Sequence, residues 1–419
     1  MQDTSRYAVG IDIGTTTVRC VVGHIDASTG TPTIVGVGSV PNSGMRKGGI
    51  ANLNGPAHAI DNALGEAERM SGYQVDAATV SINGSHLLST HADGMIAVGT
   101  ADHEITHDDL ARIEEVATMG KVPANREILE VVPHGYRLDG QDNIKDPLGM
   151  TGTRLEINAN VVSALAPHVA NLQKATDLAK VTPHTIIPAV VAAAKAVLSE
   201  QQLESGVAVI DLGGATTSIA VFEEGDLQFV SVIPMGGVNI TNDLAIGLKS
   251  DPEIAEKVKL EHASATVHGS NDTQSNISID HDGKSIEFAV QDVHEIVDAR
   301  LEEIYEAIQK ELKKAGKAGQ LPSGVVLTGG TANLKNIVDY TKASLGLAAR
   351  IGAAKGFGGV AENLDQPQFA TAVGLMLSDS EGAPALHRAQ GGSQASASAK
   401  SAVKQAGGIL SNIFGRFKA

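Results

Sequence analysis

The chain has 419 residues, a length typical of two or three domains, and 42% of them are hydrophobic, which is enough for buried cores. The net charge of −16 and the aromatic content of only 3% disfavour nucleic-acid binding, and the single cysteine, Cys20, excludes an intramolecular disulfide. The polar first residues predict no signal peptide, and no apolar run approaches the roughly 18 residues of a membrane-spanning helix.

Hydrophobic periodicity predicts alternating strands and helices, which is typical of an α/β protein. Residues 262–285 are polar and irregular. In chain order, the expected elements are strands at Tyr7–Ile13 and Val18–Val22, helices at Pro56–Met70 and from a capping box at Thr106 and Asp109 to about Met119, strands at 127–134 and 154–165, helices at Val169–Ala179 and Val190–Leu198, a strand at Val207–Ile210, and helices at Pro252–Leu260 and Val293–Leu312.

An internal repeat relates the two halves of the chain. The segment AVGIDIGTTTVRCVV from Ala8 aligns with VAVIDLGGATTSIAVF from Val207, so that Asp12 matches Asp211. In each copy an apolar strand ends in an aspartate, a glycine-containing turn rich in hydroxyl groups follows, and a second apolar strand returns. The repeat therefore predicts two similar domains, each with the same hairpin.

The composition of the two turns fits phosphate binding. Glycine lets the backbone approach a phosphate closely, threonine hydroxyls donate to its oxygens, and an aspartate holds Mg²⁺ through water. One such hairpin alone could equally be an ordinary glycine turn with no ligand. Two of them in register predict a clamp around a nucleotide. The candidate residues are Asp12, Gly14, Thr15, Thr16 and Thr17 in the first turn and Asp211, Gly213, Gly214, Ala215 and Thr216 in the second, with Asp12 and Asp211 as the Mg²⁺ residues.

Two glycine pairs lie between a strand and a helix. Gly329 and Gly330 follow the short apolar strand Val325–Leu327, and Gly236 and Gly237 precede a helix expected at Val238–Leu248. Such a pair lets a flat ring or a phosphate lie against the backbone near a helix N-terminus. Each pair is weak evidence alone.

Several segments resemble the FtsA family of bacterial cell-division proteins, within the actin-like ATPase superfamily. The resemblance extends over about residues 7–378, and DGQDNIKDPLGMTGTRLE is its most discriminating part. The segments are AERMSGY at Ala67–Tyr73, GSHLLS at Gly84–Ser89, DGQDNIKDPLGMTGTRLE at Asp139–Glu156, IPMGGVNITNDLAIGL at Ile233–Leu248 and PQFATAVGL at Pro367–Leu375.

The resemblance implies an actin-like fold of duplicated, ribonuclease-H-like α/β domains, with an additional FtsA-type subdomain and a C-terminal amphipathic helix. The implied divisions are 1–83 and 158–228 for core segments, 84–157 for the additional subdomain, 229–301 for a small subdomain, 302–377 for the rest of the second core, 378–402 for a flexible linker and 403–419 for the helix.

The resemblance also implies binding of ATP with Mg²⁺. Gly236 and Gly237 would approach the phosphates, and Glu256 and Lys259 would hold the ribose or adenine edge, although by spacing alone they are an ordinary helical ion pair. Gly329, Gly330 and Asn333 would form the adenosine end.

The chain departs from the family pattern at several positions. Thr17 stands where a lysine is frequent, so a cation facing the phosphates is missing, and Ala215 and Ser218 replace a glycine and an aspartate. Glu130, Asn160 and Asn239 stand where histidine is common. No residue is identified that positions an attacking water, so we expect weak or no ATPase activity and assign no catalytic residue.

The family implies several partners. The additional subdomain would contact the next protomer of a filament, and the small subdomain would receive the C-terminal peptide of the tubulin-like protein FtsZ. Arg300 and Glu303 match an Arg-x-x-Glu of that subdomain, although a surface salt bridge explains them equally well. Other division proteins are expected partners, and nucleic acid is not.

The last residues form a basic amphipathic segment. From Gly382 to the end there are five basic and no acidic residues, a charge of +5 against −21 for the rest. At helical spacing this segment predicts an interfacial membrane anchor, although a helix docked on the protein itself or on a partner is the alternative. The apolar stripe is Ile409, Leu410, Ile413, Phe414 and Phe417, and the basic residues beside it are Arg416 and Lys418.

These features predict a peripheral protein on the cytoplasmic face of the cell membrane, at the division septum, that polymerises and anchors the FtsZ ring. The alternatives are a sugar or acetate kinase and a pilus-associated actin-like protein of the same superfamily. A kinase gives no reason for the amphipathic tail, and both alternatives fit Asp139–Glu156 poorly.

Overall fold

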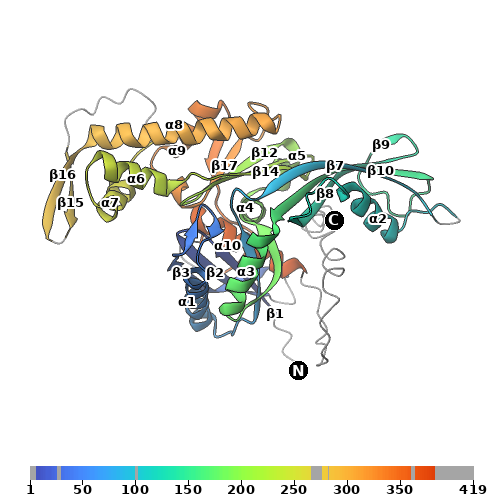
Figure 1. The fold of residues 1–419 in the computed structure, drawn as a ribbon, viewed down its shortest axis with the longest axis horizontal. Helices are drawn as coiled ribbons and strands as arrows, with labels where there is room; N and C mark the ends of the chain where they lie inside the picture. The colour runs from blue at the N-terminus through green and yellow to red at the C-terminus, as the bar shows by residue number, and fades with distance from the viewer. Residues whose placement is uncertain are drawn as a thin grey trace.

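The computed structural model describes residues 6–25, 30–99, 102–265, 276–281, 283–359 and 364–382 (Figure 1). The first core domain contains a five-stranded sheet in the order β11-β6-β1-β2-β3. Helix α1 buries an alanine-rich face against this sheet and ends at Gly72 in the left-handed conformation. The elements are β1 (Arg6–Ile13), β2 (Thr17–Ile25), β3 (Pro32–Pro41), β4 (Met45–Arg46), β5 (Gly49–Ile50), α1 (Asn54–Ser71), β6 (Ala77–Ile82), α3 (Ala166–Leu178) and β11 (Thr182–Pro188).

An additional subdomain is inserted between β6 and α3 and projects to the right in Figure 1. Its sheet has the order β7-β10-β8-β9, and one helix covers it. Thr106 and Asp109 form the predicted capping box at the start of that helix. The elements are β7 (Leu88–Ala97), α2 (His107–Thr118), β8 (Arg126–Leu138), β9 (Gln141–Ile144) and β10 (Arg154–Leu165).

The second core domain repeats the plan of the first. In the first domain β1 pairs antiparallel with β2 and parallel with β6, and in the second β12 pairs antiparallel with β13 and parallel with β17. The predicted internal repeat is therefore confirmed. The sheet order is β14-β13-β12-β17-β18, with β12 (Val207–Leu212), β13 (Thr217–Glu223), β14 (Asp226–Ile233), β17 (Val325–Thr328) and β18 (Ala349–Ile351).

A small subdomain extends from the second core on the side opposite the additional subdomain. The expectation that residues 262–285 are irregular is wrong in part, because a hairpin begins at Asn276. In this hairpin, Ile277 and Phe288 form a partner pair and pack beside the core. Ile277 lies between Asn276 and Ser278 and Phe288 follows Glu287, which is a weak version of strand alternation. The elements are α6 (Gly237–Gly247), α7 (Pro252–His262), β15 (Asn276–His281), β16 (Lys284–Ala289) and α8 (Val290–Lys314).

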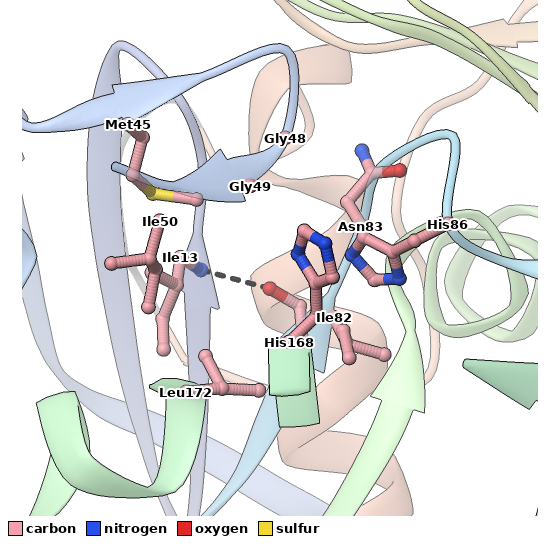
Figure 2. A pocket seen from close by; sticks show the side chains of 11 residues that line it. Ile13, Met45, Gly48, Gly49, Ile50, Ile82, Asn83, His86, His168 and Leu172 are labelled. Atoms are coloured by element: carbon pink, nitrogen blue, oxygen red, sulfur yellow. Dashed lines mark hydrogen bonds between the residues drawn. The ribbon is translucent and has the colours of Figure 1, made fainter. Parts of the chain in front are cut away.

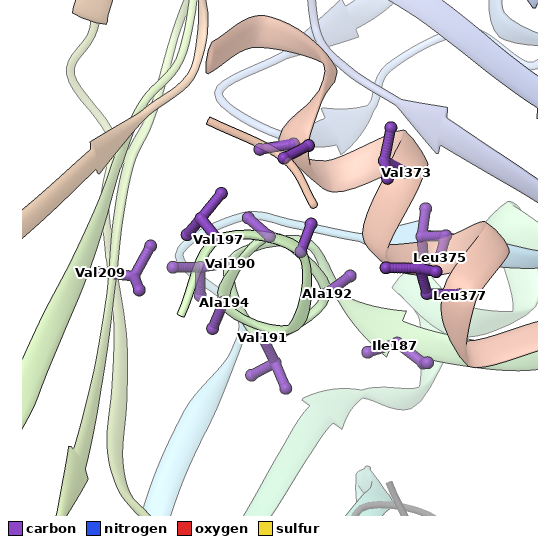
Figure 3. Packing of buried hydrophobic residues seen from close by; sticks show 14 of the residues in the cluster. Ile187, Val190, Val191, Ala192, Ala194, Val197, Val209, Val373, Leu375 and Leu377 are labelled. Carbon is purple, nitrogen blue, oxygen red and sulfur yellow. The ribbon is translucent and has the colours of Figure 1, made fainter. Parts of the chain in front are cut away.

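Two helices join the core domains. All residues of α4 are buried, and Figure 3 shows its valines and alanines packed against the last helix, α10. The two helices touch so closely that a Cβ on Gly374 would lie 1.8 Å from the Ala192 carbonyl oxygen. The remaining elements are α4 (Ala189–Val197), α5 (Glu200–Ser205), the 3₁₀ helices η1 (Gly330–Asn333) and η2 (Pro367–Phe369), α9 (Ile337–Leu345) and α10 (Ala370–Gly382).

Helix α10 also changes one predicted boundary. It runs to Gly382, so residues 378–382 are helical rather than part of the flexible linker expected at 378–402. The rest of that linker and the whole amphipathic segment at 403–419 lie outside the described residues. Within the described part of the chain, no helix is both long and apolar enough to cross a membrane.

Candidate functional site: two facing hairpin turns

The two predicted phosphate turns have the same geometry. The N–H of Gly14 donates to the Thr17 carbonyl at 3.1 Å, and the N–H of Gly213 donates to the Thr216 carbonyl at 2.9 Å. A Cβ at either glycine would lie within 3 Å of the accepting oxygen, at 2.6 and 2.9 Å. Glycine is therefore required in both turns by close backbone approach.

The two turns face each other across the junction of the core domains. A Cβ on Gly214 would lie 2.7 Å from the Thr16 side chain. The first turn is braced by the loop after β3, since the Asn42 amide donates to the Gly14 carbonyl at 2.7 Å and the Gly48 N–H donates to the Thr15 hydroxyl at 3.1 Å. The fold thus brings both sequence-predicted motifs to one place.

Asp12 and Asp211 end the central strands of the two sheets and come close together. Ser81 donates to Asp12 at 2.9 Å, and Thr371 of α10 donates to Asp211 at 3.3 Å. Burial raises the pKa of Asp211 to about 7, and the Asp12 carboxylate adds to the rise. Burial likewise raises the pKa of Asp12, while Arg19 opposes that rise. The pair is electrostatically strained in a way that a nearby cation would relieve.

Arg19 supplies a positive charge that the sequence analysis missed. It lies opposite Asp12 in the register of β1 and β2 and stacks over the Phe369 ring, 5.4 Å from its centre. Burial lowers the pKa of Arg19, and the charges of Asp12 and Asp211 raise it. Thr17 therefore does not leave the two turns without a nearby cation, and the missing charge at position 17 itself stays a prediction. Counting outward from the symmetric turn would have found the pairing.

Arg19 also has an unsatisfied donor. Its Nε is buried, and among the described residues it has no hydrogen-bond partner. Buried polar groups in native proteins nearly always have a partner. A free donor beside two carboxylates and two hydroxyl-rich turns fits a bound anion.

The N-terminus of α6 braces the second turn. The N–H groups of Gly237 and Val238 donate to the carbonyls of Gly213 and Gly214 at 3.0 and 2.6 Å. A Cβ on Gly236 would lie 2.5 Å from the Gly213 carbonyl oxygen. In this structure Gly236 and Gly237 therefore hold the turn.

The expected ribose or adenine residues form a network beside this helix. Lys259 donates to Glu256 at 2.6 Å and to Thr241 at 2.9 Å, and Thr241 donates to Glu256 as well. Lys259 also reaches the Gly237 carbonyl at 3.3 Å, which connects the network to the second turn. The i,i+3 ion pair is present, and it lies beside the site.

The expected adenosine end lies beside the second turn. Gly329 has φ 87°, and a Cβ there would lie 2.3 Å from an Asp211 carboxylate oxygen. Thr331 donates to the Gly213 carbonyl at 3.0 Å, and Asn333 donates to the Gly330 carbonyl at 3.1 Å. The Gly-Gly pair opens the short 3₁₀ helix η1.

Arg300 and Glu303 lie on α8, in the small subdomain. The Arg300 guanidinium donates to Glu303 at 2.6 Å and also to Asp243 of α6. The hydrogen bond that Arg300 donates to Asp243 raises the pKa of Arg300. The two residues therefore form the expected salt bridge, with Asp243 as a second carboxylate.

A small cavity lies behind the first turn (Figure 2). Its volume is about 10 Å³, room for a single water molecule. Ser81 in its wall accepts from the Ile13 N–H at 2.8 Å. His86 stacks on His168 with 4.0 Å between the ring centres. Burial, and to a smaller extent the charge of His168, lowers the pKa of His86 to about 4. The cavity is too small for a nucleotide and belongs to the packing behind Asp12.

Comparisons with known proteins agree with this architecture. The sequence profile described as "Cell division protein FtsA" matches residues 208–374, and that described as "SHS2 domain inserted in FTSA" matches residues 84–163. The chain is 35% identical over 369 residues to the cell division protein FtsA of Bacillus subtilis, covering 88% of this chain and 82% of that protein.

Solved structures share the fold at lower identity. The PilM–PilN type IV pilus biogenesis complex superposes with a TM-score of 0.65 at 16% identity, covering 90% of this chain and 99% of that chain. MreB5 of Spiroplasma citri bound to ADP superposes with a TM-score of 0.52 at 14% identity, covering 88% of this chain and 94% of that chain.

The chain has two similar α/β domains with facing hairpin turns, and it shares its overall fold with these neighbours, so its fold is actin-like. Two findings narrow this to one family: the inserted subdomain, and the 35% identity to the Bacillus subtilis protein over most of both chains. The chain belongs to the FtsA family of cell-division proteins.

Proposed function

We propose that this chain binds ATP between its two hairpin turns, polymerises, and anchors the FtsZ ring to the cytoplasmic face of the membrane at the division septum. The observation that carries the nucleotide part is the meeting of both turns, two carboxylates and Arg19 at one place. The kinase and pilus alternatives are not favoured, because the family assignment extends over most of the chain.

The residues of the site fit a Mg²⁺-bound nucleotide. The unsatisfied Nε of Arg19 fits a phosphate oxygen, and the glycines of both turns leave room for close backbone approach. Asp12 and Asp211 would hold the Mg²⁺, whose charge would neutralise the phosphates and relieve the repulsion between the two carboxylates. In this proposal, Glu256, Lys259 and Asn333 contact the sugar and base.

Calorimetry with ATP and Mg²⁺ tests the clamp. Asp12→Ala and Asp211→Ala should both weaken binding, because each removes an oxygen from the metal shell. Asp142→Ala is the control, since Asp142 is exposed in the additional subdomain and pairs with Arg137. If both site variants bind like the parent, the two aspartates do not hold the metal.

We propose that ATP is hydrolysed slowly or not at all. Ser218 of β13 stands where the family often has an aspartate, and its hydroxyl donates to Asn83 at 3.0 Å. Phosphoryl transfer to water requires a group that positions the attacking water, and the sequence identifies none. Phosphate release at about ten per second, an ordinary enzyme rate, would contradict this proposal.

Polymerisation is supported by the shape of the molecule. The additional subdomain and the small subdomain project from opposite sides of the core (Figure 1). Different surfaces at two ends suit head-to-tail contacts, which generate open filaments. Electron microscopy of protein sedimented with liposomes, with and without ATP, would reveal filaments, and their absence under all conditions would contradict the proposal.

Membrane anchoring rests on the segment at 403–419, whose apolar stripe, with Arg416 and Lys418 beside it, suits an anionic lipid surface. Recruitment of FtsZ rests on the family, with Arg300 as the candidate contact. Charge reversal at Arg300 should lower the affinity for an FtsZ C-terminal peptide in fluorescence anisotropy. An unchanged affinity would remove Arg300 from that interface.

A further inference from the structure

Asn83 joins the first core domain to the second phosphate turn. It directly follows the last residue of β6, and β6 pairs parallel with β1, so Asn83 lies at the same end of the sheet as Asp12. Its side-chain nitrogen donates to the Thr216 hydroxyl at 3.2 Å, and its side-chain oxygen accepts from the Ser218 hydroxyl at 3.0 Å. One amide thus bridges the two domains that would clamp the nucleotide.

The orientation of this amide is fixed by the backbone. The Asn83 Oδ1 also accepts from the N–H of Gly84 at 2.8 Å, and a backbone N–H only donates. Nδ2 must therefore be the atom that faces Thr216. The direction of the cross-domain hydrogen bond follows: Asn83 donates and the Thr216 oxygen accepts.

This direction leaves the hydrogen of the Thr216 hydroxyl available. A hydroxyl carries one donor and two acceptor positions, and Asn83 uses only an acceptor position. Among the described residues, the Thr216 hydroxyl donates to no protein acceptor. Thr216 is 4% exposed and lies in the turn that faces Thr16. A buried hydroxyl with an unused donor fits an acceptor that a ligand supplies.

We propose that Asn83 is a positioning residue for the nucleotide site, which holds the Thr216 hydroxyl so that its hydrogen points to a phosphate oxygen. The inference rests on the proposed nucleotide binding. Asn83 acts through Thr216, so its contribution depends on the phosphates and not on the nucleoside.

Replacing Asn83 by aspartate reverses the hydrogen bond. A carboxylate only accepts, so the Thr216 hydroxyl must donate its hydrogen bond to the new side chain. That hydrogen is then no longer available to a phosphate oxygen. The new negative charge would also face the phosphates. We expect Asn83→Asp to weaken ATP binding by roughly tenfold or more, since one hydrogen bond and one repulsion are involved. Adenosine affinity should stay within roughly twofold, because no phosphate contact is made.

A double-mutant cycle separates positioning from a merely structural role. The four proteins are the full-length parent, Asn83→Ala, Thr216→Val and the double variant. Calorimetry gives the affinity of each for ATP and for adenosine, and thermal unfolding gives the stability of each without nucleotide. If Asn83 acts through Thr216, adding Asn83→Ala to Thr216→Val costs no further ATP affinity. Ser218→Ala is the matched control, since it removes a bond to the same amide and leaves the bond to Thr216; its effect should be smaller than that of Asn83→Ala.

Each outcome has one meaning. Selective, non-additive loss of ATP affinity supports the inference. Equal loss of ATP and adenosine affinity, or additive effects in the cycle, overturns it and makes Asn83 structural. If the parent binds no ATP, the proposed function itself is overturned. If the parent, Asn83→Asp and Asn83→Ala all bind ATP with the same affinity, only the role of Asn83 is overturned. If Asn83→Asp does not fold, the cycle with Asn83→Ala still decides.

Discussion

Replacing Gly236 by alanine should damage both stability and nucleotide binding. Gly236 precedes α6 in an extended conformation that any residue adopts, with φ −170°, so backbone strain plays no part. The added Cβ would lie 2.5 Å from the Gly213 carbonyl oxygen, 2.8 Å from the Thr216 nitrogen and 2.9 Å from the Gly214 carbonyl carbon. All three are backbone atoms, so no side-chain rotation relieves the clash, and the second turn must move.

The magnitude follows from this overlap. Overpacking of a well-packed position costs about 1–3 kcal/mol. The two hydrogen bonds from Gly237 and Val238 that cross the same contact would be stretched, and each contributes about 0.5–1.5 kcal/mol. At about 2–4 °C per kcal/mol, the overpacking alone should lower the melting temperature by roughly 2–12 °C, and the weakened hydrogen bonds add to this fall. Because the turn itself shifts, ATP affinity should fall by roughly tenfold or more.

Differential scanning calorimetry and titration with ATP provide the assay, with Gly65→Ala as the control. Gly65 lies inside α1, and a Cβ there meets nothing within 4 Å. Alanine at this helical position should raise stability by about 0.5–1 kcal/mol and leave ATP binding unchanged. A Gly236→Ala protein with the parent's melting temperature and affinity would refute the tight packing of α6 on the second turn.

Three further predictions follow from other contacts. Arg19→Met should weaken ATP binding by roughly ten- to hundredfold, because a hydrogen bond to a charged group contributes about 1.5–3 kcal/mol; an unchanged affinity in calorimetry would remove Arg19 from the site. The hydrogen bond to Asp379 raises the pKa of His184, so the stabilisation is fully present below the ordinary pKa and is lost as the pH rises through the raised value. His184→Gln should therefore lower the melting temperature more at about pH 5.5 than at about pH 8.5, and an equal effect at both would show that the charge of His184 does not matter. Phe414→Glu places a charge in the apolar stripe of the tail and should abolish flotation with anionic liposomes without changing the melting of the body; flotation equal to the parent's would exclude this segment as the anchor.

The local parts of the site could be predicted from the sequence. Each phosphate turn depends on a few consecutive residues, namely a strand that ends in aspartate, a glycine and a hydroxyl-rich turn. The duplication then indicated that the two turns belong to equivalent places in two domains. The structure added the contact between them at Thr16 and Gly214, which is the consequence of how the two sheets pack.

The residues that were missed depend on distant partners. Nothing near Asn83 in the sequence indicates that its amide meets Thr216, more than a hundred positions later. The stretch that begins at Ser378 is rich in Gly, Ala, Ser and Gln and lacks periodicity, so its composition predicts a linker that includes the end of α10. There, Asp379 accepts from the Val9 N–H at 2.9 Å and from Thr79 at 2.8 Å, which favours continuing the helix but is invisible to periodicity.

Helix α10 is the element from which the chain continues toward the expected membrane segment. Near its start Thr371 holds Asp211, and near its end Asp379 holds β1. Mechanical tension on a tethered tail would therefore enter the molecule along this helix and reach both halves of the site. If the chain is anchored and polymerises as proposed, traction on its tail would act on the same hydrogen bonds that set the position of the Asp211 carboxylate. Each protomer of the proposed filament would then carry the load at its own pair of turns.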